Sequence, residues 1–301
     1  MELNVNGVDI TATEQSFRAC IYTDYANGHA DSLDIVFNDE FDEWKKWSLK
    51  KGDTIRVVDD VDTGKMYVSR ISISNGSYGI HAVSSPVSAL NVKSSLRESI
   101  SLHEIIKEVG DEIGLDVFMY DIKNYKYKIV ERVKVNSINY LNNILTRESY
   151  LLKIFDGKLI IYNEKKIETS DISVDIEERD LISEPSFSTS DSTLISEIEN
   201  RYNSINTLVS AQVCGRKLIT SIPSSNIIES IRFSNSIMRN ENKYEYNGVI
   251  CVEDILTAGT MINLSGSFYN WAGRNFVYKV KHDLIRNERK VFIRKPIKGE
   301  Y

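Results

Sequence analysis

Basic residues are in the minority in this chain, and long apolar runs are missing. Lys and Arg total 37 against 43 Asp and Glu, which gives a net charge of −6 over 301 residues. Nucleic-acid-binding domains usually carry a basic surplus or stripe, so this balance argues against specific nucleic-acid binding. No apolar run reaches the roughly 18 residues that a membrane-spanning helix needs. The start, M-E-L-N-V-N-G, lacks the basic and apolar regions of a signal peptide. We therefore expect neither a leader nor a membrane partner.

The cysteines and histidines are too few and too scattered for a metal or disulfide framework. Cys20, Cys214 and Cys251 are odd in number and far apart, which favours synthesis in a reducing cytoplasm. The four histidines show no His-Glu-x-x-His spacing. Asp62-Thr63-Gly64 is the aspartic-protease triplet, but that chemistry needs two carboxylates and the triplet occurs once, so we interpret it as a turn. P-loop, nucleophile-elbow and calcium-loop patterns are missing as well. We expect no enzyme activity, no metal and no cofactor.

The N-terminal part of the chain alternates between apolar and polar residues, as β-strands do. Met66 and Val68 are in phase, whereas Ile71 is out of phase with them, which predicts a β-bulge near Arg70. Asn75-Gly76 then predicts a tight hairpin turn.

A helical pattern begins near residue 101. Ser101 and Glu104 form a capping box, and Gly114 provides a helix stop after an apolar face. A second short helix is predicted around residues 138–145. Asp156-Gly157 sits between two apolar runs, which predicts a hairpin with a primed turn.

The remaining sequence divides into a polar crossing and a second β-rich part. Residues 169–192 are acidic and Ser-rich, typical of a linker or surface crossing, and completion of a first β-domain by this segment stays open. Asn226 and Glu229 predict a helix start. Four strands are expected after it, at Tyr246–Val252, Thr260–Phe268, Asn275–Asp283 and Arg289–Lys295. We expect an α+β, mainly β fold with domains at 1–96, 97–168 and 193–301, and the crossing at 169–192.

Three patches of sequence occur in an order that is typical of one family. The first contains Trp44, Trp47 and Gly52-Asp53. The second contains S-L-H-E-I-I-K-E-V-G-D-E-I-G-L at 101–115 and L-N-N-I-L-T-R-E-S-Y-L-L-K-I-F-D-G-K-L-I-I-Y at 141–162. The third contains T-A-G-T-M-I-N-L-S-G at 257–266 and F-V-Y-K-V-K-H-D-L at 276–284. Together they resemble the phage late control gene D family, the hub proteins of contractile-tail baseplates.

This resemblance implies two tail-tube-like antiparallel β-barrel domains with a small α/β domain between them. It also implies a homotrimer whose pseudo-sixfold ring joins a threefold spike to a sixfold tail tube around an axial channel. The implied partners are the spike, the tail tube or a tube-initiator protein, and baseplate wedge proteins, with the tape measure protein as a further candidate. The implied location is a virion tail baseplate or a secreted phage-tail-like bacteriocin, assembled in the bacterial cytoplasm.

Two pairs of residues are candidates for subunit contacts. Trp44 and Trp47 are expected to fill a barrel or a subunit interface, because aromatic side chains dominate such burial. Arg289 and Lys290 belong to a basic C-terminal segment, whose alternating charges indicate a solvated face or contact with an acidic partner subunit. Two other functions stay open at this point. One is a tail-associated cell-wall hydrolase component, and the other is a carbohydrate-binding β-protein that stacks sugars on these tryptophans.

Overall fold

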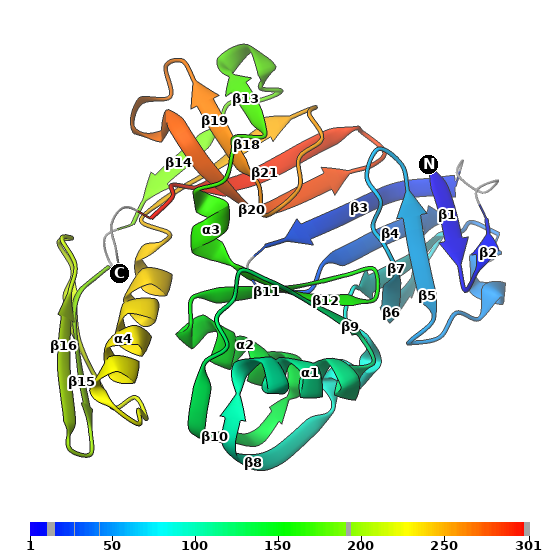
Figure 1. Cartoon of the computed structure of the whole chain (residues 1–301). Helices are drawn as coiled ribbons and strands as arrows, with labels where there is room; N and C mark the ends of the chain where they lie inside the picture. Colours follow the sequence, from blue (N-terminus) through cyan, green and yellow to red (C-terminus); the bar gives the residue numbers. More distant parts are fainter. Residues whose placement is uncertain (11–15, 27, 42, 191–193, 298–301) are drawn as a thin grey trace.

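One sheet of 13 strands runs through both ends of the chain (Figure 1). The computed structural model describes residues 1–10, 16–26, 28–41, 43–190 and 194–297. The N-terminal part supplies seven strands: β1 Glu2–Val5, β2 Val8–Asp9, β3 Phe17–Tyr25, β4 Ser32–Asn38, β5 Thr54–Val58, β6 Met66–Ser74 and β7 Ser77–Val83. The later part supplies six: β13 Val174–Glu177, β14 Ser186–Thr189, β18 Tyr246–Val252, β19 Met261–Ser265, β20 Gly273–Asp283 and β21 Glu288–Arg294.

The two halves of this sheet join where β3 and β20 pair antiparallel, with Tyr22 opposite His282. Each half nevertheless has its own apolar core, one around Leu33 and Phe37 and the other around Phe276 and Val280. The expected α+β, mainly β class is confirmed. A closed barrel is not found in the described residues, because β3 and β20 pair with each other and the strand order ends at β14 and β2.

Local features of the N-terminal half follow the sequence patterns. The pairing of β6 with β7 shifts register between Val68 and Arg70, which confirms the predicted bulge. Asn75-Gly76 joins these two strands, with Ser74 opposite Ser77. The register shift explains why the apolar phase changes along β6, since one extra residue turns every later side chain to the other face.

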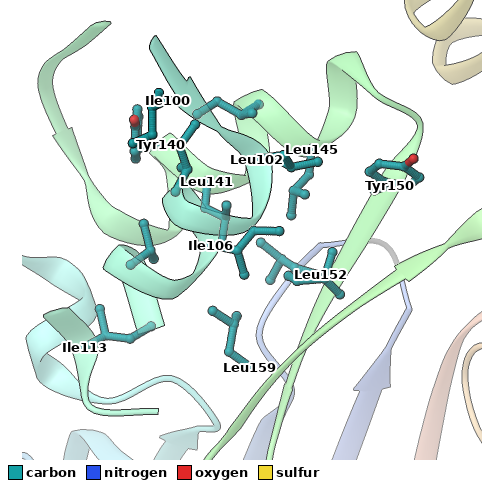
Figure 2. Close-up of a cluster of buried hydrophobic side chains, with 14 of the residues drawn as sticks. Ile100, Leu102, Ile106, Ile113, Tyr140, Leu141, Leu145, Tyr150, Leu152 and Leu159 are labelled. Atoms are coloured by element: carbon teal, nitrogen blue, oxygen red, sulfur yellow. The ribbon is translucent and has the colours of Figure 1, made fainter. Parts of the chain in front are cut away.

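A smaller α/β unit packs below this sheet in Figure 1. Its elements are β8 Val92–Ser101, α1 Leu102–Ile113, β9 Asp116–Tyr120, β10 Lys126–Asn136, α2 Ser137–Arg147, β11 Tyr150–Phe155 and β12 Lys158–Asn163. The Ser101 hydroxyl accepts the Glu104 backbone N–H, and Glu104 accepts that of Ser101, so the capping box is confirmed. Asp156 and Gly157 both have positive φ (47° and 73°), as a primed turn requires. Helices α1 and α2 bury their apolar faces against β11 and β12 (Figure 2).

The crossing segment and the region after it take separate places. β13 pairs with β19 and β14 with β18, so residues 174–189 add strands to the C-terminal half of the large sheet. β15 Ile195–Tyr202, β16 Ile205–Ser210 and β17 Arg216–Thr220 form their own small sheet, against which α4 Ile227–Asn242 packs. The predicted start of α4 is confirmed, because Asn226 caps it by accepting the Glu229 N–H.

Short helices complete the described structure: α3 Glu164–Glu168 and the 3-10 turns η2 Trp44–Trp47, η3 Val87–Leu90, η4 Glu178–Asp180 and η5 Tyr269–Trp271. None of the helices in the described ranges is both long and apolar enough to span a bilayer.

Candidate functional site

Trp44 lies in the core of the N-terminal half. Its ring stacks on Phe37 with centroids 3.8 Å apart and an interplanar angle of 19°. The residue is 9% exposed, and its backbone N–H donates to Asp39 Oδ1 at 2.9 Å. Trp44 therefore fills the sheet core and offers no open ring face on which a sugar can stack. The side chain of Trp47 lies outside the described part of the structure.

Arg289 is also an interior residue, although the sequence places it in a basic surface segment. It is 2% exposed, and its Nη2 lies 3.0 Å from Asp60 Oδ2. Its Nη1 donates to the Glu253 carbonyl at 3.1 Å. Asp60 follows β5 in the N-terminal half, so this arginine ties the two halves together and has no free guanidinium for a partner.

Lys290 points the opposite way, as alternate residues of a strand do. It is exposed and lies directly across from Lys281 on β20, and Lys279 lies on the same face. No ion pair joins these three lysines to any residue in the described ranges. Partial burial and the charges of Lys281 and Lys290 lower the pKa of Lys279. We call Lys279, Lys281 and Lys290 the lysine face.

A buried polar junction holds the α/β unit against the seam of the large sheet. Lys153 of β11 pairs with Asp24 of β3, and its Nζ lies 3.7 Å from Asp31 Oδ2. Asp31 also accepts the Tyr22 hydroxyl at 3.0 Å, and Asp24 accepts the Ala258 N–H at 2.8 Å. Burial raises the pKa of Asp31 to about 7, with a further rise from Asp24 and an opposing effect from Lys153. All three parts of the chain therefore meet at one charged cluster.

His282, the histidine of the C-terminal patch, stands beside this junction with a structural role. It is fully buried and stacks on Tyr22 with ring centroids 5.6 Å apart. Neither ring nitrogen has a hydrogen-bond partner among the described residues. Burial, followed by the charges of Arg289 and Lys153, lowers the pKa of this imidazole to about 4.

Replacing His282 with Phe is expected to lower the free energy of unfolding at pH 7 by about 1–3 kcal/mol, since the larger ring must fit a fully buried site although no hydrogen bond is lost. The imidazole has a pKa of ~6.5 in the unfolded chain and about 4 in the folded chain. The unfolded state therefore binds a proton more readily, and the wild type loses part of its stability as the pH falls from the first value toward the second. The variant should lack this loss, and urea unfolding at both ends of that range measures it. His29→Phe, at an exposed position, is the control. An acid loss of wild-type size in His282→Phe would refute this reading.

A second charged cluster joins α3, α4 and β21. Arg294 Nη2 lies 2.8 Å from Glu164 Oε1 and 2.5 Å from Glu168 Oε1. Arg239 Nη2 lies 3.1 Å from the same Glu168 oxygen, and Lys243 Nζ lies 3.4 Å from Glu164 Oε1. Burial opposes ionisation of Glu164, but Arg294, Lys243 and Arg239 lower its pKa to about 2. This cluster connects the end of the α/β unit to the C-terminal half.

The aspartate of the protease-like triplet is a turn residue. Asp62 accepts the Arg56 Nε–H at 2.9 Å and the Gly64 N–H at 2.8 Å. Burial favours its neutral form, but these two donors hold its pKa below the usual range. The turn lies in close contact with the α/β unit. A Cβ atom added to Gly64 would lie only 3.1 Å from the backbone nitrogen of Asp156 in that unit. In the described ranges, no three His, Cys, Asp or Glu residues are grouped so that they could hold a metal ion.

Sequence reasoning did not single out the residues of the two charged clusters. Lys153 interrupts the apolar run L-L-K-I-F, and Arg294 follows V-F-I. A charge inside a buried strand pattern is the signal that could have found them, because such charges need partners to be buried.

Solved structures share this fold over nearly the whole chain. A 43 kDa tail protein of prophage MuSo2 from Shewanella oneidensis has a TM-score of 0.78 at 10% identity, covering 97% of both chains. A tail protein from Neisseria meningitidis MC58 has a TM-score of 0.77 at 10% identity, covering 97% of this chain and 95% of that one. An Escherichia coli type VI secretion component, described as similar to the T4 tail proteins gp27 and gp5, has a TM-score of 0.65 at 8% identity, covering 99% and 78%.

No family model and no curated protein matches the sequence. The resemblance drawn from the three sequence patches is confirmed at the level of the fold, which this chain shares with phage tail proteins.

Proposed function

We propose that this chain is a structural hub protein of a contractile-tail baseplate, in a phage or a phage-tail-like bacteriocin. The carrying observation is the agreement of its fold, over 97% of the chain, with a prophage tail protein and a second tail protein. The order of motifs in the sequence supports the same assignment. The hub is a homotrimer, seats a spike, starts the tail tube and keeps an axial channel open.

The topology supports a ring of three chains. Each chain supplies two sheet halves with separate cores, so three chains would place six halves around one axis. The strand path ends at β14 and β2 without a further strand among the described residues. Unpaired strand edges promote aggregation unless something pairs with them or covers them, and closed rings of subunits do so.

The lysine face gives the ring a contact surface for acidic partners. Three lysines with no ion pair in the described structure repel one another, and a carboxylate-bearing surface would relieve that repulsion. We assign this contact to the tube, the tube initiator or a wedge protein. Arg289 does not belong to this contact surface, because its guanidinium is used inside the chain.

The hub acts mechanically and carries no reaction. Asp62 is held in its turn by Arg56 and by the Gly64 N–H, so its carboxylate is already engaged in hydrogen bonds within the turn. Trp44 is buried, so the carbohydrate-binding alternative loses one of the two tryptophans on which it rested. No observation favours a hydrolase.

Negative-stain electron microscopy of the pure protein with its spike tests the proposal. We expect end-on views with six densities around a central opening, since three chains place six sheet halves in the ring. Compact particles with no opening, at concentrations where the spike is bound, would contradict the ring.

A further inference from the structure

The outer edge of β9 is open. β9 pairs in parallel with β12, from Asp116 opposite Lys158 to Tyr120 opposite Tyr162, and the described residues include no strand on its other side. Such an edge presents a row of backbone N–H and C=O groups that can pair with an additional strand. The strand is short, but it is the edge strand of a sheet, and one face of that sheet packs on the apolar core of the α/β unit.

Exposed aromatic side chains lie along this edge. Phe118 is 39% exposed and Tyr120 is 55% exposed, and both point to the same face because they are two residues apart. Val117 and Met119 point the other way and pack against the buried core. The β9 edge therefore combines free backbone groups with an apolar row that its own chain leaves partly uncovered.

A pocket of about 350 Å³ lies at the end of the aromatic row. Its lining includes Tyr120, Ile160, Tyr162 and Ile167, together with Ala258-Gly259 in the turn before β19. Tyr120 belongs both to the edge and to the pocket. A side chain on a strand added beside β9 can therefore pack over Tyr120 and enter this space.

The charges along the edge are balanced. Asp116 and Lys158 lie across from each other at the start of β9, and Asp121 and Lys166 line the pocket at its end. None of these four makes an ion pair with a described residue. Each end of β9 thus offers one acidic and one basic side chain, which suits a peptide segment with charges of both signs. The net charge of such a segment matters little, so its apolar centre and its backbone determine recognition.

We infer that the β9 edge and its pocket bind an extended peptide segment of a partner protein, which adds a strand to the sheet. The segment alternates apolar and polar residues, carries charges of both signs at its flanks and places one aromatic or aliphatic side chain in the pocket. This is β-strand addition, in which main-chain hydrogen bonds give affinity and pockets for alternate side chains give specificity. The inference does not depend on the trimer or on the lysine face.

Selection from a displayed library of random peptides against the immobilised full chain tests this. Enriched peptides should alternate apolar and polar residues, and their affinity should change little between low and high salt. In a strand added beside β9, every second backbone N–H points toward β9 and the others point away. Synthetic peptides N-methylated on the amides that point toward β9 should lose binding, while peptides methylated on the other amides should keep it.

Tyr120→Ser should weaken these peptides at least about tenfold and leave the unfolding transition unchanged. Phe41→Ser is the matched control, since Phe41 is an exposed aromatic residue in the large-sheet part of the chain. Failure to enrich alternating peptides, equal tolerance of both methylation sets, or full binding by Tyr120→Ser would overturn the inference. So would a change in oligomeric mass in Tyr120→Ser, because it would make this edge a contact between copies.

Discussion

Glu164→Gln is expected to lower the free energy of unfolding by about 3 kcal/mol or more. Glu164 is 1% exposed and faces Arg294, Lys243 and Arg239, all of them buried. Removing its charge leaves three buried cations with Glu168 as the one remaining carboxylate of the cluster. Unfolding in urea at neutral pH measures the loss, and Glu131→Gln at an exposed position of β10 is the control.

The same substitution has a defined pH signature. The pKa of Glu164 is about 2 in the folded chain and ~4.3 in an unfolded one. The unfolded state thus binds the proton more readily, and the stabilisation is complete above the unfolded pKa and lost as the pH falls toward 2. The difference between wild type and Glu164→Gln should shrink over that range. An unchanged unfolding curve at neutral pH would contradict the assignment of this cluster as a structural clamp.

Reversing the lysine face is expected to break docking without unfolding the chain. Lys281→Glu with Lys290→Glu should weaken binding to the tube or wedge protein by about a hundredfold, because two attractive contacts become repulsive. Both side chains are exposed and make no ion pair among the described residues, so the thermal unfolding of the variant should stay close to wild type. Binding of the purified proteins at several salt concentrations measures the effect, which high salt should reduce.

Lys50→Glu with Lys51→Glu is the matched control, since these lysines are exposed in the loop before β5. Arg289→Glu should behave differently from both, because it places a carboxylate next to Asp60 inside the chain. We expect that variant to lose stability first and docking only as a consequence. Wild-type affinity of the lysine-face variant for tube and wedge proteins would contradict the contact assigned to this surface.

Local features could be predicted from the sequence because neighbouring residues determine them. The Ser101 capping box and the Asp156-Gly157 turn involve only nearby residues, and both are confirmed. The continuous sheet could not be predicted in this way. β3 and β20 pair across more than two hundred residues, and the alternation within each strand is the same whether it closes a barrel or joins two halves.

The candidate contact residues show a similar division. Arg289 shares its phase with Val291 and Ile293, so strict alternation already places it inside, and Lys290 falls on the other face. Lys153 differs, because its strand face is buried only where the large sheet docks on the α/β unit. The apolar run around Lys153 marks it as unusual, but its partners on the large sheet come from tertiary contact and cannot be identified from the local sequence. Trp44 lies in the core of the N-terminal half, stacked on Phe37.

The mass of the assembled protein tests the hub proposal most directly. Native mass spectrometry or light scattering of the pure chain, with and without its spike partner, distinguishes one subunit from three. The hub proposal predicts three subunits, either for the chain alone or once the spike is present. A protein that stays strictly monomeric and fails to bind the spike would contradict it.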